Sequence, residues 1–153
     1  MDKLQALVVG SRFGKDYMLN ETECLYCAKN SLIGKNSLPK LPVAAAKAFA
    51  EALAVYETLR QSGRTVRFDH SMEGVMYVYP PGNAQEQNIS EYVLVMANGT
   101  GAKRAAAIDK AIKLGRQLRK DGLVATVEGK ECRFIKLRQM FFEPVSQPRQ
   151  RRQ

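Results

Sequence analysis

The sequence has no tryptophan and only one histidine, and it lacks the G-x-S-x-G motif of serine hydrolases. The single histidine, His70, falls in a predicted turn. The glycine-rich segment 98–103 lacks the G-x-x-x-x-G-K-[ST] spacing of a nucleotide-hydrolysing phosphate loop. The sequence therefore predicts no enzyme and no cofactor. A metal-dependent nuclease is the one catalytic class that its scattered acidic pairs leave open.

Cysteine is also scarce, with three residues in the chain. Cys24 and Cys27 have the C-x-x-C spacing, but the only other zinc-binding candidates of the right type are Cys132 and His70. A second closely spaced pair is missing. We therefore expect no metal site, and a buried structural role for the pair on a short helix.

Long hydrophobic runs are missing. Residues 6–9 form one short run, and the run 43–56 is interrupted by Lys47 and Glu51, whereas a membrane span needs about 20 apolar residues. The apolar stretch 4–9 is too short for a secretory signal. These absences predict a cytoplasmic protein with reduced cysteines and no membrane partner.

Acidic residues do not balance the basic ones in the second half of the chain. Residues 1–89 carry 10 Lys/Arg and 9 Asp/Glu, whereas residues 90–153 carry 14 Lys/Arg and 6 Asp/Glu. The net charge of +9 is therefore concentrated after residue 90. Such a surplus raises the local concentration of anionic partners, so it favours a polyanion.

Hydrophobic periodicity and turn residues predict an α+β fold. Helices are expected over 20–29, 42–61 and 102–120, strands over 4–10, 16–19 and 91–97, and hairpins over 64–79 and 123–142. The two long helices each carry one apolar stripe. We therefore expect an antiparallel-rich sheet with both of them packed on one face.

The second half of the chain echoes the first at an offset of 59 residues, which aligns Phe49 with Ile108 and Gly63 with Gly122. This echo suggests a duplicated strand-helix-hairpin unit, with halves 1–82 and 90–143 inside a single domain 1–143. A helix followed by glycine and a hairpin is also a common unit, so duplication and coincidence both remain open. The segment 144–153 has no apolar periodicity, and we expect a disordered basic tail.

The predicted helix 102–120 holds seven cations against one acid, Asp109. The cations are Lys103, Arg104, Lys110, Lys113, Arg116, Arg119 and Lys120. Lys113, Arg116 and Lys120 fall on one line of the helix, while residues such as Ile108, Ile112 and Leu118 are expected to face inward. A row of this kind can neutralise phosphates, and the alternative is a solvated helix face.

Three further groups extend the basic surface. The last hairpin contributes Arg133, Lys136 and Arg138, and the tail contributes Arg149, Arg151 and Arg152. The glycine-rich turn before the basic helix (Gly99, Thr100 and Gly101) is a candidate phosphate-contacting loop, because free amide groups open a helix there. Tyr77, Tyr79 and Phe134 are candidates for base stacking, although aromatic residues in sheets are more often core residues.

Together these features predict a non-enzymatic nucleic-acid-binding protein that contacts mainly the phosphate backbone. DNA is slightly favoured over RNA, and single-stranded DNA is a candidate target. The alternative is a protein-interaction or inhibitor module that docks its basic face on an acidic protein. A homodimer through an exposed sheet face is a further candidate. The nucleic-acid hypothesis requires that the cations of the helix and of the last hairpin share one side of the molecule.

Overall fold

The computed structural model describes residues 9–13, 16–34, 36, 38, 40, 45–82, 90–138, 140 and 142. In chain order its elements are β1 (Ser11–Phe13), β2 (Asp16–Met18), α2 (Glu21–Lys29), α3 (Ala46–Gln61), β3 (Val66–Phe68), β4 (Val75–Val78), β5 (Tyr92–Met96), α4 (Gly101–Leu118), β6 (Asp121–Glu128) and β7 (Glu131–Leu137). Most of the predicted strand 4–10, the linker 83–89 and the basic tail lie outside the described residues.

Five of the strands form one sheet in the order β3-β4-β5-β6-β7. All neighbours are antiparallel except β5 and β6, which run parallel with Leu94 opposite Leu123. The parallel pair follows from its connection, because α4 carries the chain from the end of β5 back to the start of β6. The predicted α+β class and antiparallel-rich sheet are confirmed, and the parallel centre is an addition to them.

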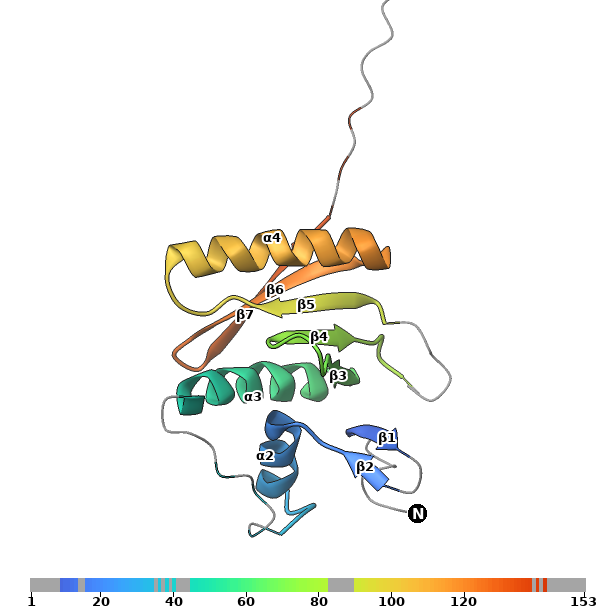
Figure 1. The fold of residues 1–153 in the computed structure, drawn as a ribbon, viewed down its shortest axis with the longest axis vertical. Helices are drawn as coiled ribbons and strands as arrows, with labels where there is room; N and C mark the ends of the chain where they lie inside the picture. The colour runs from blue at the N-terminus through green and yellow to red at the C-terminus, as the bar shows by residue number, and fades with distance from the viewer. Residues whose placement is uncertain are drawn as a thin grey trace, which may run out of the picture.

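The two long helices lie on opposite faces of this sheet, with α4 on one side and α3 on the other (Figure 1). The prediction that they share one face is wrong. Alternate residues of β5 show why: Val93 and Val95 pack with α4, whereas Leu94 packs with α3. Central strands that are apolar at consecutive positions need cover on both faces.

The short helix α2 begins as predicted, at Asn20. The Asn20 side chain accepts a hydrogen bond from the Glu23 amide at 2.8 Å, and the Glu23 carboxylate accepts one from the Asn20 amide at 3.0 Å. This reciprocal pair is a capping box. Glu23 also accepts a hydrogen bond from the Gly10 amide at 3.1 Å, so the buried carboxylate fastens the strand β1 region to the start of the helix.

The join between α4 and β6 differs from the prediction in detail. The helix ends at Leu118, and Arg119 then adopts the left-handed conformation with φ of 54°. Gly122, two residues beyond the predicted end of the helix at residue 120, lies within β6. A side chain at Gly122 would stand 2.9 Å from the Ala111 carbonyl oxygen, so this glycine allows α4 to approach the strand closely.

The two predicted halves do not pack as repeats. In the first hairpin the leading strand, β3, lies at the sheet edge, whereas in the second hairpin the trailing strand, β7, lies at the opposite edge. Their helices also cover opposite faces. The sequence echo therefore does not correspond to a repeated arrangement in space.

Candidate nucleic-acid interface

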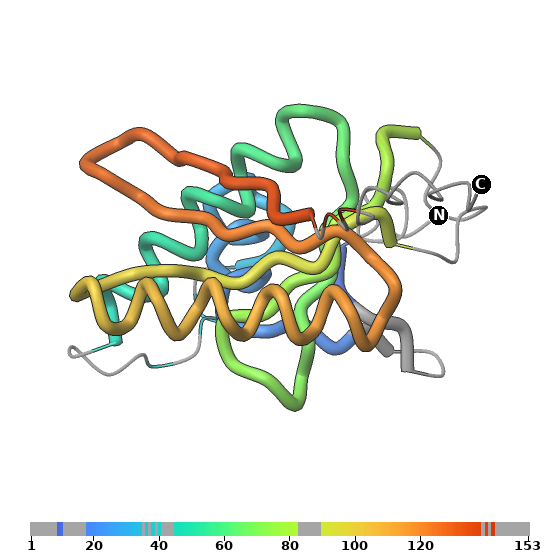
Figure 2. The backbone as a smooth tube through the Cα atoms, turned by 90° about the horizontal axis from the view of Figure 1, so that it is seen from above, coloured from blue at the N-terminus to red at the C-terminus, as the bar shows by residue number. Residues whose placement is uncertain are grey.

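A groove with a volume of about 720 Å³ lies where α4 ends beside the end of β7. We call it the basic groove. Figure 2 shows α4 running alongside the β6–β7 hairpin. The lining residues are Glu91, Ala111, Ile112, Gly115, Arg116, Arg119, Lys120, Asp121, Gly122, Lys136, Leu137 and Arg138.

Five of the predicted cations gather around this groove. Arg116 and Arg119 come from the end of α4, Lys120 from the connection to β6, and Lys136 and Arg138 from the end of β7. With Glu91 and Asp121 as the two carboxylates, the lining carries five positive and two negative charges, a net +3. The helix and the last hairpin therefore both supply cations to the lining of the groove. The register of β7 places the Lys136 side chain on the α3 face of the sheet, with Leu123 and Tyr92, so Lys136 does not share the side of α4 that the nucleic-acid hypothesis required.

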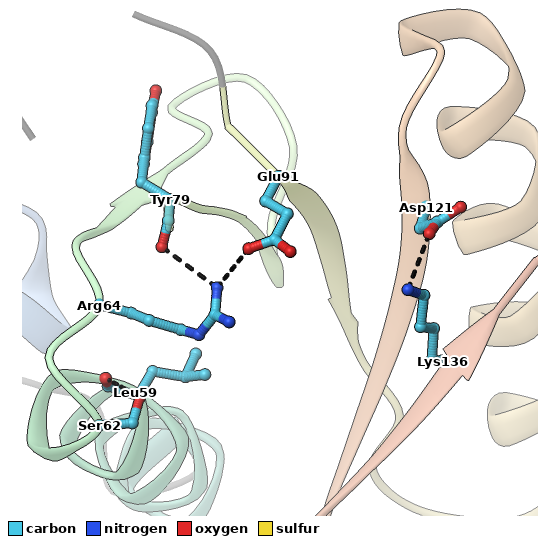
Figure 3. Close-up of polar contacts among 7 residues, drawn as sticks. All are labelled: Leu59, Ser62, Arg64, Tyr79, Glu91, Asp121 and Lys136. Carbon is cyan, nitrogen blue, oxygen red and sulfur yellow. Dashed lines mark hydrogen bonds and ion pairs between the residues drawn. The ribbon is translucent and has the colours of Figure 1, made fainter. Parts of the chain in front are cut away.

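Lys136 forms an ion pair across the two strands at the groove. Its Nζ lies 2.9 Å from Asp121 Oδ2, and Figure 3 shows the two side chains meeting between β6 and β7. The hydrogen bond to the Asp121 carboxylate raises the pKa of Lys136. The Lys136 Nζ also lies 5.2 Å from the centre of the Tyr92 ring. Lys136 is thus fixed in position, with its charge partly balanced.

Glu91, the second carboxylate of the groove, is held by Arg64. The Arg64 guanidinium lies 2.6 Å from Glu91 Oε2 and also reaches the Tyr79 carbonyl oxygen at 3.4 Å (Figure 3). The hydrogen bond from Arg64 lowers the pKa of Glu91. Arg64 lies 5.5 Å from the centre of the Tyr92 ring, so this ring contacts two cations. Both carboxylates of the groove are therefore already paired.

Three further cations of the groove, Lys120, Arg119 and Arg138, have weaker attachments than Lys136. Lys120 donates a hydrogen bond to the Ser90 hydroxyl, a neutral partner that leaves its charge uncompensated. Arg119 and Arg138 are exposed, and no ion pair joins either of them to another described residue. These side chains supply most of the positive potential available to a ligand.

The floor of the groove is apolar. Ile112 of α4 and Leu137 of β7 form this floor, next to the buried contact that Ala111, Gly115 and Gly122 make between α4 and β6. Ile112 was expected to face the core, but its side chain is 37% exposed. On β7, Ile135 is 51% exposed. The helix covers β5 and β6 and leaves this edge of the sheet open.

The other cations of α4 lie away from the groove. Arg104 is 3.9 Å from Glu128, which also pairs with Arg133 at 3.2 Å. Lys110 donates a hydrogen bond at 3.4 Å to the carbonyl oxygen of Glu73, which lies in the turn between β3 and β4. Lys103 and Lys113 are exposed and do not line the groove. The predicted line therefore divides, with Arg116 and Lys120 at the groove and Lys113 outside it.

The candidate phosphate loop is separate from the groove. Gly99, Thr100 and Gly101 lie at the start of α4, whereas the groove lies at its end. Thr100 is the N-cap residue by position, but its side chain makes no capping hydrogen bond. Lys103 folds back beside Gly99, where an added side chain would stand 2.9 Å from the lysine chain. A phosphate at this loop stays a prediction, independent of the groove.

The three candidate stacking residues are dispersed. The Tyr77 hydroxyl donates to Asp69 Oδ2 at 2.5 Å, and its ring packs against the apolar cluster beneath α4. Tyr79 lies beneath the Arg67 guanidinium, 5.7 Å away. Phe134 packs against the cluster beneath α3. They share no surface with the groove, and the tail cations Arg149, Arg151 and Arg152 lie outside the described residues.

The expected burial of the cysteine pair holds for Cys27, whereas Cys24 is half-buried. Cys24 and Cys27 both lie on α2, and burial raises the pKa of the Cys27 thiol to about 11, which keeps it protonated. Cys132 lies on β7, and all three are free thiols. Within the described part of the chain, no three His, Cys, Asp or Glu side chains are placed to hold a metal ion.

Sequence reasoning missed Arg64, Tyr92 and the apolar floor as parts of the site. Their proximity depends on the parallel pairing of β5 with β6, which brings residues 90–92 beside residue 121. A signal for this was present, because a strand, a glycine-rich turn, a helix and a further strand are typical of a parallel crossover unit. Residues 91–128 follow that order.

No protein-family model matches the chain, and no curated protein sequence is significantly similar to it. The groove must therefore be judged on its own geometry. Within the described ranges, none of the helices combines the length and apolar character needed to cross a membrane.

Proposed function

We propose that this protein binds nucleic acid without catalysing a reaction, and that it holds the phosphate backbone in the basic groove. The observation that carries the proposal is that five cations from α4, the α4–β6 connection and β7 line one groove. Cations on a common surface release counterions when they neutralise phosphates, which gives affinity with a strong salt dependence.

The arrangement of charge within the groove supports phosphate as the ligand. Three of the five lining cations are arginines, whose planar guanidinium groups can donate two parallel hydrogen bonds to a phosphate. Asp121 and Glu91 are occupied by Lys136 and Arg64, so their charges repel an approaching anion less than free carboxylates do. A slight preference for DNA and a cytoplasmic location stay predictions from the sequence.

The alternative function is docking on an acidic protein. It is favoured by the exposed apolar side chains of α4 and β7, which are Ile112, Leu118 and Ile135. An acidic amphipathic segment offers both carboxylates and apolar groups to such a surface. A homodimer through a sheet face also stays a prediction, and here α3 and α4 cover the two faces of the central strands.

Fluorescence anisotropy with labelled single- and double-stranded DNA and RNA, titrated over a range of salt concentrations, tests the proposal. We expect the double variant Arg116→Ala/Arg138→Ala to weaken binding by about tenfold or more, equivalent to about 1.4 kcal/mol. The matched control, Lys103→Ala/Lys113→Ala, removes the same net charge from exposed positions outside the groove and should have a much smaller effect.

Thermal unfolding of both double variants checks that each is folded. An absence of binding to every nucleic acid near physiological salt overturns the proposal. Tight binding to polyglutamate in its place favours the acidic-protein alternative. Cleavage of the labelled strands only when Mg²⁺ is added shows that the protein is a nuclease and overturns the non-enzymatic assignment.

A further inference from the structure

We propose that the basic groove holds one unstacked nucleotide of a single strand, with the base on the apolar floor and the neighbouring phosphates against the cations. The protein then binds single strands in preference to duplexes. This inference rests on the proposed function, and it adds the class of nucleic acid and the way in which the groove distinguishes it.

The shape of the groove separates two kinds of contact. One wall is the end of α4, with Arg116 and Arg119, and the other is the end of β7, where Arg138 follows Leu137. Cations on both walls can hold the backbone on either side of one nucleotide. The volume of about 720 Å³ lies within the usual range of pockets for small organic ligands.

The apolar floor offers a hydrophobic contact, which a base can make and a phosphate cannot. Ile112 and Leu137 present apolar side chains beside the close contact of α4 with β6 at Gly115 and Gly122. An unstacked base has two apolar faces that can cover such a floor. In a duplex these faces are stacked inside the helix, so only phosphates and groove edges reach a protein surface.

The floor also predicts little preference among bases. None of the described lining residues is aromatic, so a base would be held by aliphatic contact and not by ring stacking. The carboxylates that offer directed hydrogen bonds, Glu91 and Asp121, are engaged by Arg64 and Lys136. Aliphatic contact with a base face is available to all four bases, in the way that stacking platforms tolerate any sequence.

The experiment compares fluorescently labelled oligo(dT) with a duplex of equal length at one salt concentration. We expect oligo(dT) to bind at least about tenfold more tightly, which corresponds to about 1.4 kcal/mol. Ile112→Ser places a hydroxyl on the floor and should weaken oligo(dT) binding severalfold, with little effect on the duplex. Leu118→Ser is the matched control, because Leu118 is 39% exposed on the same helix but does not line the groove.

An abasic single strand of the same length supplies a test that needs no variant, since it keeps the phosphates and removes the bases. It should bind the unmodified protein severalfold more weakly than oligo(dT). Equal binding of the abasic strand, or equal loss for both nucleic acids in Ile112→Ser, overturns the placement of a base on the floor.

The outcomes also separate the two proposals. Duplex binding as tight as or tighter than oligo(dT) binding overturns the single-strand inference and leaves the proposed function standing. Binding to neither nucleic acid overturns both.

Discussion

Arg119 has a backbone conformation that favours glycine, although its side chain lies at the basic groove. It caps α4 with φ of 54°, a left-handed conformation that glycine usually supplies at the end of a helix. An ordinary L-residue pays about 1 kcal/mol or more for this conformation. The Arg119 side chain lines the basic groove. A strained non-glycine residue at a ligand surface is consistent with selection for its side chain.

Replacing Arg119 with glycine should therefore separate stability from binding. We expect Arg119→Gly to increase the free energy of unfolding by up to about 1 kcal/mol, because glycine adopts the left-handed conformation freely. The same variant should bind single-stranded DNA severalfold more weakly. Urea unfolding and anisotropy measure the two effects. A stabilised variant with unchanged affinity would show that the guanidinium does not contact the ligand.

Asp69 organises the turn between β3 and β4. Its carboxylate accepts hydrogen bonds from the amides of Ser71 and Met72 and from the hydroxyls of Ser71 and Tyr77. Partial burial alone would raise the pKa of Asp69, but these four hydrogen bonds outweigh it and lower the pKa to about 2. The ionised carboxylate therefore stabilises the folded state.

This shift predicts a pH dependence of stability. An unfolded aspartate titrates near pH 3.9, so the Asp69 contribution is fully present above about pH 4 and is lost as the pH falls toward 2. Asp69→Asn should lower the free energy of unfolding at pH 7 and reduce the loss between pH 4 and 2. Urea unfolding across this pH range measures both. Identical pH profiles for the variant and the unmodified protein would contradict the assignment.

At the scale of elements, the contact between α4 and β6 depends on two glycines. A side chain at Gly115 would stand 2.8 Å from the Lys120 carbonyl oxygen, and one at Gly122 would stand 2.9 Å from the Ala111 carbonyl oxygen. Both neighbours are backbone atoms, which cannot rotate away as a flexible side chain can. Close approach of the helix to the strand therefore requires glycine at these positions.

We expect Gly122→Ala to destabilise the protein by about 1–3 kcal/mol, the usual range for forcing extra volume into a packed interface. Gly101→Ala is the matched control, because no atom lies within 4 Å of a side chain added there and α4 begins at that residue. Alanine has a higher helix propensity than glycine, so Gly101→Ala should leave the free energy of unfolding unchanged or raise it by up to about 1 kcal/mol. Differential scanning calorimetry compares the two. Equal melting temperatures would exclude a steric role for Gly122.

Local elements were predictable from the sequence, whereas their arrangement was not. The short helix that starts near Asn20 and the two hairpins depend on neighbouring residues, and the structure confirms them. The placement of α3 and α4 on opposite faces depends on which side of β5 each helix covers. A helix with one apolar stripe can bury it on either face of the sheet, so the stripe alone does not predict which face each helix covers.

The candidate site shows the same division. The sequence identified Arg116, Arg119 and Lys120 as cations of one helix, and Lys136 and Arg138 as cations of one hairpin. It did not distinguish them from Lys103 or Lys113, which the structure places outside the groove. The distinction arises only when β7 lies beside the end of α4. That position depends on pairing between segments distant in the sequence.

At the scale of the whole molecule, the position of the charge matters more than the total of +9. Asp121 lies in the basic groove, and Asp109 is an exposed residue of α4 outside it. Asp121→Asn and Asp109→Asn raise the net charge by the same amount. If the ligand binds in the groove, Asp121→Asn should change the binding affinity more than Asp109→Asn, although both variants have the same net charge.

We expect Asp121→Asn to tighten nucleic-acid binding severalfold at low salt and to steepen its salt dependence, because Lys136 loses its anionic partner. Asp109→Asn should change the affinity much less. Anisotropy titrations at several salt concentrations compare the two variants. Equal gains from both would mean that net charge alone attracts the ligand, without a defined groove.

The parallel pair at the centre of the sheet also has a consequence for the order of folding. The hairpins β3–β4 and β6–β7 join strands that are adjacent in sequence, so they can form early. Pairing of β5 with β6 must await α4, which connects them. The basic groove forms only when that crossover closes. We therefore expect the groove to be among the last parts of the molecule to assemble, so a ligand of the groove would bind only chains whose central sheet is complete.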